Sequence, residues 1–151
     1  MIFSKPECLT MLLDAADGTD PALACSIIHA LSQWQPNTTN VAGSEKDSET
    51  WGLFQFTSQQ ARQSGYKGDL PQLLEVGLNI QIGLDLLRNS LTIANNYADK
   101  ALLLYLGRSR VMLIPGIMSL IPLYEKLIAA RPENHETKVA CDIFGAGLRP
   151  N

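Results

Sequence analysis

The side chains best suited to acid–base chemistry lie in one polar stretch of the chain. Glu45, Asp47 and Glu49 stand two residues apart, just before the aromatic segment WGLFQF. A carboxyl group can donate or accept a proton during catalysis. A charge cluster in a loop is more commonly a solvated surface, so both interpretations stay open.

The cysteine and histidine residues do not form a metal-binding pattern. Cys8, Cys25 and Cys141 make an odd number of cysteines without a C-x-x-C pair, which argues against a zinc site and against a disulfide framework. We expect buried, reduced thiols. His29 has no second metal-type ligand near it in the sequence, so we interpret it as a structural or surface residue.

Length and composition indicate one globular domain spanning residues 1–151. The chain is 46% hydrophobic and 18% charged, within the range of ordinary soluble domains. The net charge is −3, and the Lys and Arg residues are scattered rather than gathered into a stripe. This pattern argues against a nucleic-acid partner.

Neither a signal peptide nor a membrane-spanning segment is expected. The first residues carry Lys5 and Glu7 before only a short apolar run, which predicts cytoplasmic synthesis without a signal peptide. The longest apolar stretch, Val111 to Leu123, is shorter than the ~20 residues of a spanning helix. We therefore expect a core helix there and no stable insertion into a membrane.

Hydrophobic periodicity predicts an all-α protein. Asp20 is the expected N-cap of a helix that begins at Pro21 and stops near Pro36. The stretch from Gln35 to Thr50 has loop composition, and WGLFQF fits a short strand or a tight extended turn. The other predicted helices run from Thr57 or Ser58 to Gly65, from Pro71 onward, from about Tyr97 to Leu106, from about Pro115 to Ala130, and from about Glu136 to Phe144.

The segment that begins at Pro71 has the clearest helical pattern in the chain. Its leucines and isoleucines recur every four residues and predict one buried face. Glu75 is expected at the surface or as a capping residue. The predicted face consists of Leu74, Leu78, Ile82 and Leu86, widened by Leu73, Ile80 and Leu87.

Four segments, in this order, resemble the motifs of the soluble lytic transglycosylase family, including its bacteriophage-type members. The resemblance covers about Pro21 to Gly107. It implies a lysozyme-like all-α fold with a long polar loop or short hairpin beside the cleft. We expect the C-terminal helices over 115–144 to pack on this domain. The segments are IIHALSQWQPN, WGLFQF, NIQIGLDLL and LLLYLG.

The first motif departs from the family pattern at its central residue. Ser32, Trp34 and Pro36 match, but Leu31 occupies the position of the family's catalytic Glu. The second motif, Gly-Leu-Phe-Gln-Phe in phage-type members, is reproduced completely. In the later motifs the matching residues are Asn79, Ile80, Gly83, Leu86, Leu87, Tyr105, Leu106 and Gly107, with a weaker similarity over Ala140 to Phe144.

The resemblance implies a specific reaction that needs no cofactor. Family members cleave the bond between N-acetylmuramic acid and N-acetylglucosamine. One Glu protonates the leaving oxygen and then accepts the proton of the muramoyl 6-hydroxyl, which closes an anhydro ring. Leucine transfers no proton, so Leu31 predicts little or no cleavage by this route. Tyr105 resembles the tyrosine that supports the catalytic carboxylate, and we expect its hydroxyl to lack that partner.

The resemblance also implies the ligand, peptidoglycan glycan strands, and the residues that contact it. The Gln55 amide can pair with a sugar acetamido group, although a structural turn is an equal alternative. Trp34 and Trp51 can stack on sugar rings, although aromatics of this kind are more often core residues. A carboxylate of the loop before WGLFQF can stand in for the missing acid. The implied substrate-binding residues are Ser32, Trp34, Glu49, Phe54 and Gln55.

Three interpretations of the whole chain follow. It is an inactivated variant of an active enzyme, or a natural pseudoenzyme that binds glycan without cutting it. The third interpretation is a protein-interaction or inhibitor module that uses the helix from Pro115 to Ala130. In the first two we expect a monomer that acts at the bacterial cell wall or periplasm after release or export, as an endolysin, a virion component or part of a secretion machine.

Overall fold

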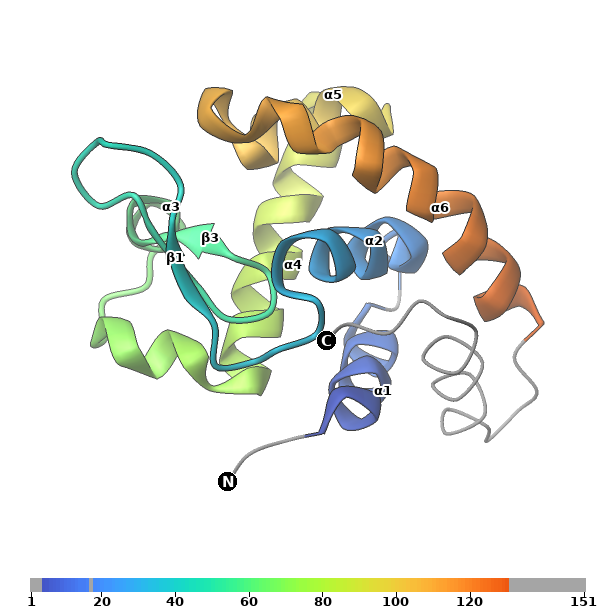
Figure 1. Cartoon of the computed structure of the whole chain (residues 1–151), viewed down its shortest axis with the longest axis horizontal. Helices are drawn as coiled ribbons and strands as arrows, with labels where there is room; N and C mark the ends of the chain where they lie inside the picture. The colour runs from blue at the N-terminus through green and yellow to red at the C-terminus, as the bar shows by residue number, and fades with distance from the viewer. Residues whose placement is uncertain (1–3, 17, 131–151) are drawn as a thin grey trace.

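The computed structural model describes residues 4–16 and 18–130. Within these residues the structure has six α-helices, two 3₁₀ helices and a small antiparallel sheet at one side, which confirms the all-α class (Figure 1). The helix predicted over Glu136 to Phe144, and Cys141 within it, lie outside the described residues. In chain order the elements are α1 Lys5–Ala15, α2 Pro21–Ser32, β1 Thr39–Val41, β2 Glu49–Trp51, β3 Phe56–Thr57, α3 Ser58–Gln63, η1 Leu70–Leu74, α4 Val76–Ile93, α5 Ala98–Leu106, η2 Arg108–Leu113 and α6 Ile114–Ala129.

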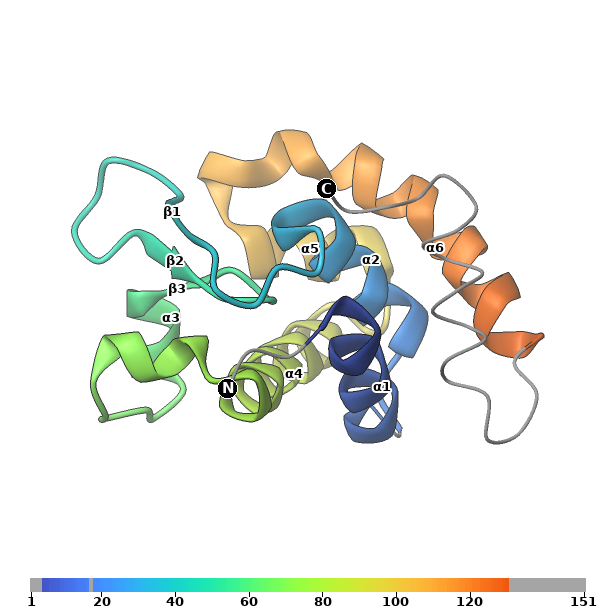
Figure 2. The same ribbon diagram turned by 60° about the horizontal axis from the view of Figure 1, so that its bottom comes forward.

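Helix α4 runs through the middle of the molecule. It separates the sheet and α3 on one side from α1 and α2 on the other, and α5 and α6 close the remaining side (Figures 1 and 2). Contacts between elements support this arrangement: α4 packs on α1 and α5, and α2 packs on α6.

Helix α1 was not predicted, although its first residues carry a recognisable signal. Ser4 and Glu7 form a capping box, in which the Glu7 amide donates to Ser4 Oγ (3.3 Å) and the Ser4 amide donates to the Glu7 carboxylate (2.9 Å). Pro6 lies in the first turn, where its missing amide hydrogen costs nothing. The helix places Cys8 in the core.

The predicted helix caps are confirmed. The Asp20 carboxylate accepts the Leu23 amide at 3.1 Å, and the Thr57 hydroxyl accepts the Gln60 amide at 3.0 Å. Glu75 caps α4 by accepting two amides of the first turn, at 3.1 and 2.6 Å. Each cap satisfies amides that the helix itself leaves unpaired.

The long helix and its buried face were predicted only in part. Helix α4 begins at Val76, because the residues after Pro71 form the separate 3₁₀ helix η1. Of the predicted stripe, only Ile82 is buried, and Leu74, Leu78 and Leu86 are half-buried. The buried face of α4 is turned toward the positions that were expected to widen the stripe, and consists of Val76, Asn79, Ile80, Ile82, Gly83, Leu84, Leu87, Ser90 and Leu91.

The polar stretch before WGLFQF contains a short hairpin. Strands β1 and β2 pair antiparallel with Thr39 opposite Trp51, and β3 adds to β2 with Thr50 opposite Thr57. The WGLFQF segment supplies the end of β2, the tight turn and the start of β3. The structure therefore selects the hairpin over the unstructured loop.

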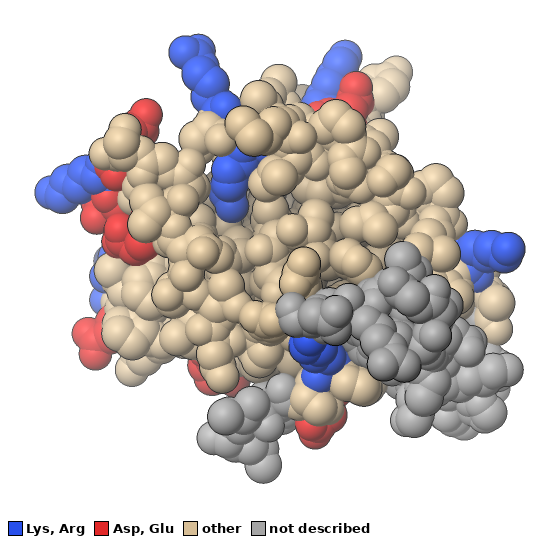
Figure 3. Space-filling model, viewed as in Figure 1, with Lys and Arg blue, Asp and Glu red and all other residues tan. Residues whose placement is uncertain are grey.

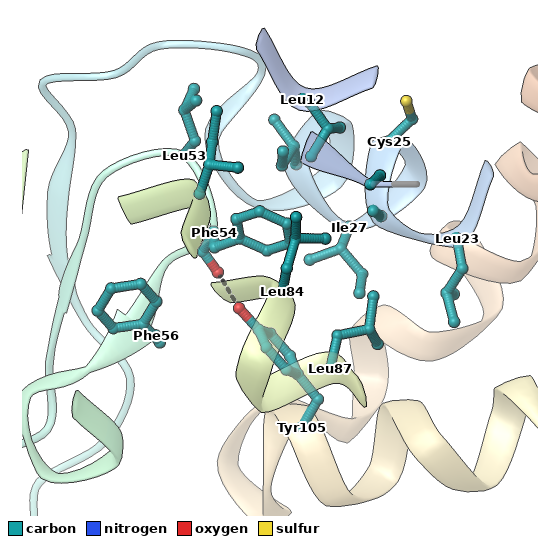
Figure 4. Close-up of a cluster of buried hydrophobic side chains, with 14 of the residues drawn as sticks. Leu12, Leu23, Cys25, Ile27, Leu53, Phe54, Phe56, Leu84, Leu87 and Tyr105 are labelled. Carbon is teal, nitrogen blue, oxygen red and sulfur yellow. Dashed lines mark hydrogen bonds between the residues drawn. The ribbon is translucent and has the colours of Figure 1, made fainter. Parts of the chain in front are cut away.

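The core gathers apolar side chains from α1, α2, α4, α5 and the turn between β2 and β3 (Figure 4). Phe54 lies at its centre, fully buried against α4. A Cβ at Gly83 would overlap the Phe54 ring, so glycine is required there for the turn to reach the helix. Cys8 and Cys25 are free, buried thiols, as predicted, and burial raises the pKa of Cys8 to about 11.

The apolar run from Val111 to Leu123 is not the core helix that the sequence suggested. The run is divided between η2 and α6, and Ile117 is its only fully buried residue. By length and composition, the segment Arg108–Ala129 could cross a membrane, and 11% of its apolar window is buried. Much of its surface is therefore accessible to a partner.

A chain of hydrogen bonds connects α6 to α2. Trp34 Nε1 donates to the Tyr124 hydroxyl at 3.1 Å, and this hydroxyl lies 2.8 Å from His29 Nδ1. The Tyr124 oxygen accepts from Trp34, and its own hydrogen can be donated to His29 Nδ1 in the neutral tautomer that leaves this nitrogen unprotonated. Burial lowers the pKa of His29, which favours the same neutral form.

We expect the free energy of unfolding to fall as the pH drops below about 6.5, the ordinary pKa of histidine. The folded state holds His29 neutral, so the unfolded state binds more protons there, and the loss of stability continues through the lowered folded-state pKa. Urea denaturation from pH 7.5 to 5 measures this slope. His29→Gln should flatten it, and parallel curves for the two proteins would contradict the prediction.

Candidate functional site

Leu31 lies at the edge of a pocket of about 170 Å³ between the end of α2, the hairpin and η2. The side chain is half-buried in the last turn of α2. One wall of the pocket is apolar, with Leu31 and Leu113, and the other is polar. The residues that line it are Ala30, Leu31, Asn40, Val41, Ala42, Thr50, Gln55, Arg110 and Leu113.

Gln55 holds the hairpin together with its whole amide group. Its Oε1 accepts from Thr50 Oγ1 (2.6 Å) and Asn40 Nδ2 (3.1 Å). Its Nε2 donates to the carbonyls of Thr38 (2.9 Å) and Gly52 (2.8 Å). All four hydrogen-bonding positions of the amide are used. Gln55 lines the pocket, but its amide is fully used within the hairpin. These contacts favour a structural role in the turn over pairing with a sugar acetamido group.

Tyr105 supports the same turn from the opposite side. Its buried hydroxyl donates to the Phe54 carbonyl at 2.6 Å (Figure 4), and burial raises its pKa above the ordinary range. The partner of this hydroxyl is thus a backbone carbonyl and not a carboxylate. Tyr105 acts on the pocket indirectly, by fixing the backbone next to Gln55.

The family model for the transglycosylase SLT domain matches residues 13–111, from the end of α1 into η2. The chain belongs to this family. Among curated proteins and solved structures, none matches it. The matched region of this SLT domain includes Leu31 and both strands of the hairpin, and it ends before α6.

Three of the residues expected to bind substrate are part of the core of this SLT domain. Ser32 is 4% exposed, and its hydroxyl donates to the Ile28 carbonyl at 3.0 Å. Trp34 and Phe54 are completely buried. A ring with no exposed face cannot stack on a sugar, and the buried Ser32 hydroxyl is already bonded to the backbone. These three side chains therefore do not line the site.

Trp51 and Glu49 are joined through one hydroxyl. Trp51 Nε1 donates to Ser58 Oγ at 2.8 Å, and Ser58 Oγ donates to the Glu49 carboxylate at 2.7 Å. The hydrogen bond from Ser58 lowers the pKa of Glu49. A general acid needs a raised pKa, so Glu49 is poorly suited to that role. The ring of Trp51 remains half-buried.

A second, larger pocket lies beside the first. It has a volume of about 450 Å³ between the β1–β2 connection and the segment from Leu104 to Ser109. Ala42 lines both pockets, so they adjoin, and together they are called the cleft below. Glu45 lines the larger pocket, and Asp47 is exposed in the same connection. Figure 3 shows charged side chains near this end of the molecule and a broad uncharged area beside it.

Arg110 is the functional candidate that the sequence analysis missed. It is 8% exposed, it lines the Leu31 pocket, and its Nη1 donates to the Gln55 carbonyl at 2.6 Å. Its Nε donates to the Leu106 carbonyl at 3.3 Å, and its buried Nη2 has no hydrogen-bond partner. The only available signal was its place three residues after the last motif.

The pocket suits binding better than proton transfer. Of the described residues that line it, none carries a carboxyl or imidazole group. Within residues 4–16 and 18–130, no cluster of three acidic, His or Cys side chains is arranged for a metal ion. The polar wall offers a guanidinium and an amide group, beside an apolar wall that includes Leu31.

Proposed function

We propose that this SLT domain binds the glycan strands of peptidoglycan in the cleft and does not cleave them. Membership of the SLT family supports the ligand. One observation carries the absence of cleavage: the pocket at position 31 is lined by leucine and by no carboxyl group of the described chain. Glycan hydrolysis and transglycosylation both require a positioned acid.

The carboxylates of the hairpin give little support to a replacement acid. Glu49 is held by Ser58 with a lowered pKa, and Asp47 is exposed. Glu45 lines the adjoining pocket rather than the pocket beside Leu31, and it too is exposed.

Sedimentation with purified peptidoglycan tests the proposal. We expect the unaltered chain to pellet with the insoluble glycan, while mass spectrometry of the supernatant finds neither anhydro-muropeptides nor reducing-end products. Ala42→Trp fills the junction of the two pockets and should weaken retention about tenfold or more, since one lost contact of ~1.4 kcal/mol has that effect. Ala129→Trp, at the exposed end of α6, is the matched control. Equal retention of both variants would overturn the cleft as the binding site.

We place this binding at the bacterial cell wall, reached after release, after export or as part of a virion. The location follows from the proposed ligand, and the phage-type form of the second motif supports the virion or endolysin setting. In this proposal a catalytic partner or an active relative cleaves the glycan strand locally.

The exposed side of α6 favours one other candidate function, a protein-interaction or inhibitor module. The helix lies outside the family match, and Ile117 and Tyr124 are its only buried residues. If peptidoglycan neither retains the unaltered chain nor is cut by Leu31→Glu, this function becomes the better explanation.

A further inference from the structure

We propose that the pocket beside Leu31 is a carboxylate-binding site, in which Arg110 receives a ligand carboxylate carried on a short apolar stem. In peptidoglycan this chemistry belongs to an N-acetylmuramic acid whose lactyl carboxylate is free rather than linked to a peptide. The identity of this ligand rests on the proposed glycan binding. The carboxylate site itself rests on Arg110 and its surroundings.

The first step is the uncompensated charge of Arg110. The guanidinium remains protonated at any physiological pH. It is more than nine-tenths buried, and both of its hydrogen bonds go to neutral backbone carbonyls, of Gln55 and Leu106. The ion pair found in the described part of the chain is between Arg88 and Asp85, away from the pocket. Within residues 4–16 and 18–130 no carboxylate pairs with Arg110, and a buried cation in such surroundings strongly favours an anion nearby.

The second step is the shortage of free acceptors around that charge. Both lone-pair positions of Gln55 Oε1 are occupied by Thr50 and Asn40, so this oxygen cannot turn to Arg110. Arg110 Nη2 keeps its hydrogens unused. Among the described residues the Asn40 amide donates to Gln55 alone, which leaves its second hydrogen for a ligand. The pocket thus presents donors and positive charge, which match a carboxylate better than a neutral amide.

The third step is the apolar wall and the space beside it. Leu31, Leu113 and Val41 line the other side, in a pocket of about 170 Å³. This volume accommodates a carboxylate with a small alkyl group, such as the methyl-bearing lactyl substituent. Position 31 is where the family carries its acid, so the ligand supplies the negative charge that the leucine does not.

The covered position of Nη2 does not prevent this role. The atom is hidden from solvent, so direct contact requires a small side-chain rotation at the pocket. The charge also acts through space, because the surrounding protein screens it far less than water would. Affinity therefore depends on the charge of the ligand as well as on a new hydrogen bond.

Binding of two matched disaccharides tests the proposal. One is N-acetylglucosaminyl-N-acetylmuramic acid with its free lactyl carboxylate, and the other is the same sugar with a lactyl carboxamide. We expect the acid to bind roughly ten- to a hundredfold more tightly, as for a charge-assisted hydrogen bond. Titration calorimetry with the full chain gives both constants. Propionate should bind much more weakly than the disaccharide acid, and equal affinity would overturn the assignment to glycan.

Variants separate the charge of Arg110 from its structural role. Arg110→Met should reduce the preference for the acid to less than twofold. Arg62→Met is the matched control, because it also removes one positive charge and hydrogen bonds to backbone carbonyls, and should keep the preference. Leu31→Glu places a carboxyl in the pocket and should abolish the preference even if Arg110→Met does not fold, whereas Leu31→Gln should retain it.

The outcomes separate this proposal from the proposed function. Equal affinity of acid and carboxamide for the unaltered chain would overturn the carboxylate site while glycan binding stands. Retention on insoluble peptidoglycan without binding of either disaccharide would also overturn it. Loss of all glycan binding would remove both.

Discussion

Replacing Leu31 with Glu is expected to release soluble muropeptides from purified peptidoglycan about 10²- to 10⁴-fold faster than the unaltered chain, the usual contribution of a positioned general acid. The new carboxyl group would extend into the pocket between the end of α2, the hairpin and η2, at the position where the family resemblance places the acid. The surrounding turn is already fixed by Gln55 and Tyr105. Mass spectrometry of the supernatant measures the products.

The products and the control define the reaction. Anhydro-muropeptides indicate the transglycosylase route, and reducing-end products indicate a muramidase. Leu31→Gln has the size and polarity of the glutamate without its proton and should stay inactive. If the unaltered chain cuts as fast as Leu31→Glu, cleavage does not depend on an acid at position 31, and Glu45 and Asp47 become the residues to mutate.

Replacing Asn79 with Ala is expected to lower the free energy of unfolding by about 3–5 kcal/mol, because each unpaired buried polar group costs roughly 1–3 kcal/mol. Asn79 is 1% exposed, and its Oδ1 accepts the Phe54 amide at 3.0 Å. Its Nδ2 donates to the carbonyls of Trp51 and Leu73 at 2.8 and 2.9 Å. The change leaves three backbone groups without this partner. Urea denaturation measures the loss.

The control for this prediction lies on the same helix. Asn89→Ala removes an exposed side chain of α4 and should change stability by less than about 0.5 kcal/mol. If Asn79→Ala costs under about 1 kcal/mol, water or a shifted backbone satisfies the freed groups, and the turn does not depend on this side chain.

The motif residues of this SLT domain mostly build the site rather than contact its ligand. Asn79 and Tyr105 hold the turn at Phe54 from two helices, and Gly83 leaves room for the Phe54 ring. This turn positions Gln55, whose backbone carbonyl accepts a hydrogen bond from Arg110. A motif match therefore indicates a preserved frame, and the Leu31→Glu variant tests whether an acid at position 31 makes that frame catalytic.

The local structure could be predicted from the sequence because its signals act over three or four residues. Asp20, Thr57 and Glu75 cap their helices through side chains that reach the nearest amides. The family resemblance located Leu31 and the WGLFQF turn before any geometry was known. Even the missed helix α1 carries such a local signal, the capping box of Ser4 and Glu7.

Only the tertiary structure decided which side of each element is buried and which groups meet. Helix α4 is apolar around more than one face, and its contacts with α1, α5 and the turn selected Ile80 over Leu78 for the core. The sequence left Trp34 open as a sugar platform, with the core as the more common alternative, and its hydrogen bond to Tyr124, 90 residues away, appears only in the structure. Arg110 becomes a candidate site residue only through its burial beside Gln55, a contact between residues 55 apart in the chain. Pairings of this length depend on the packing of the whole chain, which no local pattern records.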